Sequence, residues 1–122
     1  MQLQSYVMGR WHGSQVNAVA LRDATTGEVI AQASSDGIDF RAALDHARQV
    51  GGAGLRRLTF HERAACLKTL AKRLTELKAE FYARSFATGA TKNDSAIDID
   101  GGISTLFVFA SKGSKELPDS RV

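Results

Sequence analysis

The sequence predicts an α+β fold in which a small antiparallel strand element comes first and three helices follow. Short apolar runs alternate with turn residues in residues 1–35, whereas from Asp39 onward the apolar residues recur at helical spacing. The chain has 122 residues, 43% of them hydrophobic and 24% charged, which is typical of a globular protein. We therefore expect a strand segment at 1–35 and a three-helix segment at 36–122.

Two or three short strands are expected in the first segment. The run from Ser5 to Gly13 is apolar and ends in glycine, and residues 16–21 continue with alternation. A polar link, residues 23–28, then separates that run from the apolar run 29–33, and Gly27 near its end suits a hairpin. A sheet this small is marginal alone, so it needs another element to pack against.

The first two helices have recognisable start signals. Phe40 opens an apolar i, i+3, i+4, i+7 pattern, with Asp36 or Asp39 as the N-cap and Gly51-Gly52 as the stop. Residues 59–62, Thr-Phe-His-Glu, match a capping box, in which the hydroxyl and the carboxylate each bond a free backbone N–H. The apolar stripe that follows consists of Leu67, Leu70, Ala71, Leu74, Leu77 and Phe81.

A third helix is expected after a glycine turn. Gly89 is placed to end the second helix as a left-handed C-cap, and one of the residues 93–95 caps the third. Gly113 is expected to close this helix. Its apolar face consists of Ile99, Ile103, Leu106, Phe107 and Ala110.

Charge and hydropathy exclude several partners. Sixteen Lys and Arg against thirteen Asp and Glu give a net charge of +3, and the basic residues alternate with acids, so a nucleic-acid surface is not expected. No signal peptide pattern opens the chain and no 18-residue apolar stretch occurs. We therefore expect a cytoplasmic protein that does not contact a membrane.

Residues that could carry chemistry are scattered. Cys66 is the only cysteine, and we expect it to be a half-buried structural thiol. The three histidines are far apart, and the aspartates before Gly101 lack the spacing of a calcium loop. Gly51 to Gly54 lacks the full dinucleotide fingerprint. These observations predict no metal site, no cofactor site and no catalytic residue.

Several short motifs, taken in order, resemble the amino-terminal region of aldehyde dehydrogenases. The family has a GxW motif, a Thr-Gly-Glu turn, an alanine-rich helix, Glu-Arg opening a second helix and Thr-Gly ending it. The matching stretches cover nearly the whole chain, and they are Tyr6-Val-Met-Gly-Arg-Trp11, Thr26-Gly-Glu-Val-Ile30, Phe40 to Ala47, Glu62-Arg63 with Leu67 and Ala71, and Thr88-Gly89. The resemblance implies an α+β fragment of a larger α/β fold.

One branch of the family is especially similar. Thr88-Gly-Ala-Thr91, Asp98-Ile-Asp-Gly-Gly-Ile103 and Gly113 to Pro118 resemble phenylacetate-degradation enzymes that join the dehydrogenase to an oxepin-CoA hydrolase of the hydratase type. That branch oxidises a CoA-linked semialdehyde with NADP. The chain departs from the family at Asp23-Ala, where Asn-Pro is common.

The resemblance also implies what this stretch does not contain. The family's catalytic cysteine, glutamate base, oxyanion-hole asparagine and nucleotide-binding residues all come after position 122, as do the Rossmann core, the catalytic domain and the hydratase domain. Cys66 is therefore not the nucleophile. We expect an inactive scaffold that borders the cofactor domain, binds no NADP by itself, packs on the remainder of the enzyme chain and belongs to a homo-oligomer when complete.

Gly101 and Gly102 are the candidate site residues. Each glycine inside a helix costs about 1 kcal/mol relative to alanine, so close approach or open space should explain them. The resemblance implies that residues 96–110 border the substrate tunnel, with Gly101 at its mouth. Two explanations stay open, which are an entrance wide enough for a CoA thioester and close packing of helices.

A different class of function also fits the pattern. The three apolar stripes could close on one another in a free-standing helical interaction module without catalytic activity. An isolated module would unfold cooperatively, whereas part of an enzyme would expose apolar surface.

Overall fold

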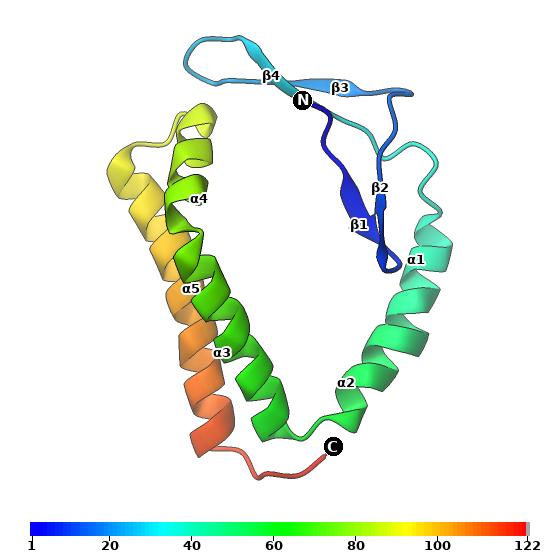
Figure 1. The fold of residues 1–122 in the computed structure, drawn as a ribbon, viewed down its shortest axis with the longest axis vertical. Helices are drawn as coiled ribbons and strands as arrows, with labels where there is room; N and C mark the ends of the chain where they lie inside the picture. Colours follow the sequence, from blue (N-terminus) through cyan, green and yellow to red (C-terminus); the bar gives the residue numbers. More distant parts are fainter. Residues whose placement is uncertain (122) are drawn as a thin grey trace. The chain divides into compact units, whose positions relative to one another are not determined.

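A computed structural model describes residues 1–121 as strands followed by helices (Figure 1). The chain divides into two compact units, Met1–Ala53 and Gly54–Val122. The expected α+β order of elements is confirmed. The boundary between the units falls after Ala53, inside the first helical stretch. The predicted segments, 1–35 and 36–122, instead separate the strands from the helices.

The first unit contains two separate antiparallel hairpins. Strands β1 (Ser5–Val7) and β2 (Arg10–His12) pair through a two-residue turn in which both φ angles are positive, at 51° and 80°. The described residues thus form four strands where two or three were predicted, because the run from Ser5 to Gly13 turns back at Met8-Gly9 and methionine is not a typical turn residue. Across the pair, the rings of Tyr6 and Trp11 meet edge to face with centroids 5.1 Å apart.

The second hairpin was correctly predicted. Strand β3 (Val19–Arg22) pairs with β4 (Val29–Ala33), and Gly27 adopts φ of 75° in the link. Asp23 fixes the turn because its Oδ1 accepts the backbone N–H groups of Thr25 and Thr26 at 2.8 and 2.9 Å. The backbone hydrogen bonds from Thr26 and Thr25 lower the pKa of Asp23.

The first helical stretch is longer than expected. Asp39, one of the two predicted caps, is the N-cap of α1 (Phe40–His46), and its side chain accepts a hydrogen bond from the Ala42 N–H. The predicted stop at Gly51-Gly52 is wrong, because these glycines lie in a π-helical turn, η1 (Ala47–Gly52), that leads directly into α2 (Ala53–Arg57). The backbone therefore continues its helical path through both glycines.

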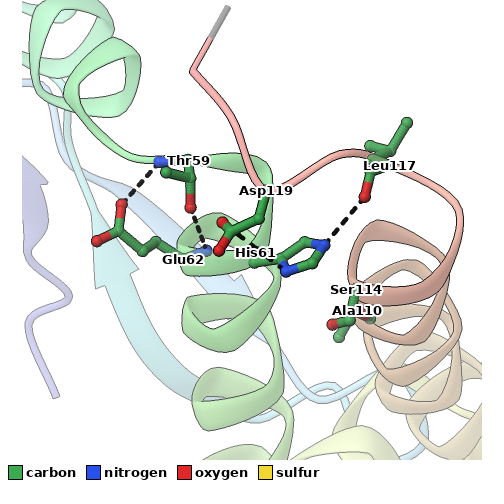
Figure 2. A network of polar contacts seen from close by, with 7 residues as sticks. All are labelled: Thr59, His61, Glu62, Ala110, Ser114, Leu117 and Asp119. Carbon is green, nitrogen blue, oxygen red and sulfur yellow. Dashed lines mark hydrogen bonds and ion pairs between the residues drawn. The ribbon is translucent and has the colours of Figure 1, made fainter.

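The second helical stretch starts as predicted and contains an unexpected break. The capping box of Thr59 and Glu62 opens α3 (Phe60–Glu76), as Figure 2 shows. Leu77, at φ −93° and ψ 4°, then separates α3 from α4 (Lys78–Ser85). A 3-10 turn, η2 (Phe86–Thr88), ends at Gly89, whose φ of 81° confirms the left-handed cap.

The last helix, α5 (Lys92–Lys115), corrects two expectations. Its N-cap is Thr91 rather than one of residues 93–95, because Thr91 Oγ1 accepts from the Asp94 N–H while the Asp94 carboxylate accepts from the Thr91 N–H. The Thr91 hydroxyl also donates to Asp94 Oδ2 at 2.6 Å, and this hydrogen bond, followed by the one from the Thr91 N–H, lowers the pKa of Asp94. Gly113 does not end the helix, which runs two residues further.

Within the second unit, α3 and α5 lie side by side and form its core (Figure 1). The buried apolar residues on these two helices are small except for one, and they are Ala64, Ala71, Ala110 and Ile103. A Cβ on Gly113 would stand 3.1 Å from the Cβ of Ala64, closer than most real contacts. The two helices therefore approach closely because side chains at their contact are short or missing.

Replacing Gly113 with leucine should lower the free energy of unfolding by about 1–3 kcal/mol, because the new side chain would overpack the contact with Ala64. Gly102→Ala is the matched control and should raise that free energy by about 1 kcal/mol, since its Cβ would meet no described atom within 4 Å. Denaturant unfolding of the 122-residue chain, followed by circular dichroism, measures both. A leucine at position 113 without cost would contradict the close packing.

Candidate functional site

The two candidate glycines lie side by side in the middle of α5. A Cβ placed on Gly101 or Gly102 would have no atom of the described chain within 4 Å, apart from the helix's own backbone. Close packing against another helix of this chain therefore does not explain them. The glycine that does serve close packing is Gly113, which was predicted only to end the helix.

An ion pair stands next to the glycine pair. Lys78 Nζ, at the start of α4, lies 2.7 Å from Asp100 Oδ1, the residue before Gly101. The two side chains are 36% and 42% exposed, and their geometry is that of a contact ion pair rather than an aligned hydrogen bond. The pair joins two helices, so no spacing rule within a single helix could have found it.

The pKa values of both members of the ion pair and of the neighbouring Tyr82 are shifted. The contact with Lys78 lowers the pKa of Asp100, and the contact with Asp100 raises the pKa of Lys78, each against a smaller effect of desolvation. Desolvation first, and then the Asp100 charge, raises the pKa of Tyr82, whose ring centroid lies 5.9 Å from Lys78 Nζ. All three groups therefore keep their ordinary ionisation at neutral pH.

A second polar contact joins the same elements. Ser95 is completely buried near the start of α5, and its Oγ lies 2.9 Å from Ser85 Oγ at the end of α4. A shallow hollow of about 240 Å³ lies between the ion pair and the following turns of α5, lined by Thr75, Lys78, Asp100, Ile103, Ser104 and Phe107. The glycine pair thus stands on a helix that α4 holds at two points.

Other residues considered as site candidates have local structural roles or none. Cys66 is exposed on α3, so the expectation of a half-buried thiol is wrong. His12 bonds the Asp36 carbonyl at 2.8 Å, and His61 bonds the Leu117 carbonyl at 3.0 Å and lies 3.8 Å from Asp119 (Figure 2). Residues 1–121 contain no cluster of three side chains suited to a metal ion.

The described residues do not fit a dinucleotide. Both hairpins are antiparallel, and Gln2 and Gln32 form one isolated parallel bridge, whereas dinucleotide sites use parallel βαβ units with a glycine-rich loop. Gly51 to Gly54 lie inside a helical stretch. None of the described helices combines the length and apolar character needed to cross a membrane.

The comparisons with known proteins agree with the order of motifs along this fold. The model of the aldehyde dehydrogenase family matches residues 11–121. The chain belongs to the aldehyde dehydrogenase family. A 3,4-dehydroadipyl-CoA semialdehyde dehydrogenase from Aromatoleum evansii is 43% identical to it over 114 residues. That alignment covers 93% of this chain and 22% of the relative, so the chain spans about a fifth of the length of this aldehyde dehydrogenase.

The Lys78–Asp100 pair predicts a pH-dependent contribution to stability. The folded-state pKa of Asp100 is lowered from the usual 3.8, so the contribution is complete above that value and is lost as the pH falls through the lowered pKa. The stability difference between the natural chain and Asp100→Asn should therefore be present at pH 7 and shrink in strong acid. Unfolding curves at several pH values measure it, and a difference independent of pH would rule out this origin.

Proposed function

We propose that this chain is the scaffold part of an NAD(P)-dependent dehydrogenase that oxidises a CoA-linked semialdehyde to the corresponding acid. The supporting observation is the 43% identity to a dehydrogenase named for a CoA semialdehyde, over 93% of the chain. We also propose that the enzyme works in an aromatic catabolic pathway, uses NADP as its cofactor and is a homo-oligomer. These proposals are supported by the similarity of residues 88–118 to the phenylacetate branch. An oxepin-CoA hydrolase domain in the same polypeptide is part of the same prediction.

The role of this stretch in that enzyme follows from what its residues offer. The described part has exposed apolar faces, two hairpins and a glycine pair on a braced helix, but no cluster of acid, base and nucleophile. Chemistry on the aldehyde would need a nucleophile, and a hydride acceptor supplied by the cofactor. We assign both to other parts of the enzyme and a supporting role to this chain.

The glycine pair fits a wide substrate entrance. Where Gly101 and Gly102 stand, the surface of α5 has no side chain and no described neighbour within 4 Å. A CoA thioester is far bulkier than a simple aldehyde, so the missing side chains would widen its path. This proposal gives the two glycines a reason to remain in a helix that alanine would stabilise.

The complete polypeptide that contains this chain should reduce NADP when it is given a CoA-linked semialdehyde, and the 122-residue chain alone should not. Absorbance of the reduced nicotinamide measures the rate, with NAD and a CoA-free aldehyde as comparisons. A complete polypeptide that is folded, binds the nucleotide and yet oxidises no CoA-linked semialdehyde would overturn the substrate class.

Leucine at both Gly101 and Gly102 in the complete enzyme should raise KM for the CoA-linked semialdehyde by roughly tenfold or more, as steric mismatch in a binding site does. The same change should alter KM for a short aldehyde much less. Alanine at both positions is the control, because it adds only one carbon to each. Equal KM values for the glycine and leucine enzymes would dispose of the entrance proposal.

A further inference from the structure

An open apolar groove runs between the first turns of α3 and the last turns of α5. Its volume is about 340 Å³, and its apolar walls include Phe60, Leu67, Phe109 and Leu117. At the bottom of the groove Ala64 faces Gly113, so no side chain larger than a methyl group lies between the helices there. The groove therefore results from the same close approach that forms the core of the second unit.

The apolar side chains that form the walls of this groove are unusually exposed to solvent. Phe109 is 59% exposed and Leu117 is 44% exposed, although both belong to a surface that also contains the half-buried Phe60 and Leu67. Contiguous exposed apolar surface of this kind marks an interaction site or a ligand groove. The shape and composition of the groove thus call for an apolar occupant.

Arg63 supplies the polar feature of the groove. Its guanidinium lies 5.3 Å from the Phe60 ring centroid, and Nη2 donates to the Leu58 carbonyl at 3.2 Å. This is the only hydrogen bond of the Arg63 side chain within residues 1–121, where its Nε is shielded from solvent without an acceptor. A guanidinium has five N–H donors, so Arg63 retains the capacity to bond an occupant.

The charge balance of the groove favours an acidic occupant. Lys112 Nζ lies 3.1 Å from Glu116 Oε1, so these two charges neutralise each other. Glu62, next to Arg63 in the sequence, is committed to the capping box with Thr59. No ion pair of Arg63 occurs in the described part of the chain, which leaves one uncompensated positive charge beside an apolar surface.

We propose that an apolar segment from the rest of the dehydrogenase polypeptide fills this groove and brings a carboxylate to Arg63. The inference rests on the proposed function, because it needs the further polypeptide that such an enzyme has. The length argument supports it, since this chain covers only 22% of the matched relative. It also gives separate roles to the two residues of the Glu62-Arg63 motif, with Glu62 starting the helix and Arg63 docking the partner segment.

A second copy of the chain suits the groove less well. A two-fold contact places the same patch on both sides of the interface. Two Arg63 guanidinium groups would then enter one apolar interface, where the groove carboxylate, Glu116, is already paired with Lys112, and unpaired buried charges are costly. The occupant therefore has to differ from the groove in charge.

Hydroxyl-radical footprinting of the complete enzyme and of the 122-residue chain tests the proposal. Phe109, Phe60 and Leu117 should be labelled in the short chain and should lose most of that labelling in the complete enzyme. Equal labelling in both would overturn the proposal even if the enzyme is active. Protection in a complete polypeptide that oxidises no CoA-linked semialdehyde would support the docking and contradict only the proposed function. Protection of the short chain that grows with concentration would assign the groove to a second copy and overturn it.

Matched variants extend the test. Phe109→Lys should lower the Tm of the complete enzyme, because the docked segment would bury a side chain that is 59% exposed in the described chain. Thr69→Lys adds the same charge at an exposed position of α3 outside the groove and should leave that Tm unchanged. Arg63→Gln should lower the Tm of the complete enzyme more at low than at high salt, as loss of an ion pair does. A salt-independent effect would exclude the carboxylate.

Discussion

Close approach of α3 and α5 is the constraint on which the second unit depends. The two helices lie close together because the residues at their contact are small, namely alanines at positions 64, 71 and 110 and glycine at 113. Ile103 is the one large buried side chain between these helices in the described chain. Dispersion attraction across such a contact comes from many backbone and methyl atoms rather than from large interlocking side chains. An added side chain at this contact would therefore force the two helices to shift locally.

That constraint also decides where each glycine can act. Because α3 occupies one side of α5, the surface at Gly101 and Gly102 stays open, while Gly113 faces Ala64. The brace from α4, through the Lys78–Asp100 and Ser85–Ser95 contacts, then limits how the open stretch can move. Packing, cap and ion pair thus hold a bare segment of helix in place, which is consistent with the proposed substrate entrance.

The helix starts could be predicted because capping depends on neighbouring residues. The contacts between elements could not be predicted. Asp39 and the Thr59–Glu62 box could be identified because a cap acts within four residues. Thr91 was overlooked because its partner, Asp94, replaces the usual glutamate. The break at Leu77 leaves the 3.6-residue period of the stripe nearly intact, so periodicity could not reveal it. Whether a helical glycine meets open space or a neighbour depends on residues about fifty positions away, as Ala64 and Gly113 show.

The amount of buried apolar surface argues against a free-standing module. The buried apolar residues of the described chain are four alanines and one isoleucine, while Trp11, Phe40 and Phe109 are all more than half exposed. Alanine buries little area, and stability from apolar burial scales with area, so this core alone offsets little of the conformational entropy lost on folding. A module evolved to fold alone would place its aromatic rings inside. Aromatic side chains left outside on strands and helices alike are consistent with a scaffold whose apolar faces are completed by other parts of a dehydrogenase.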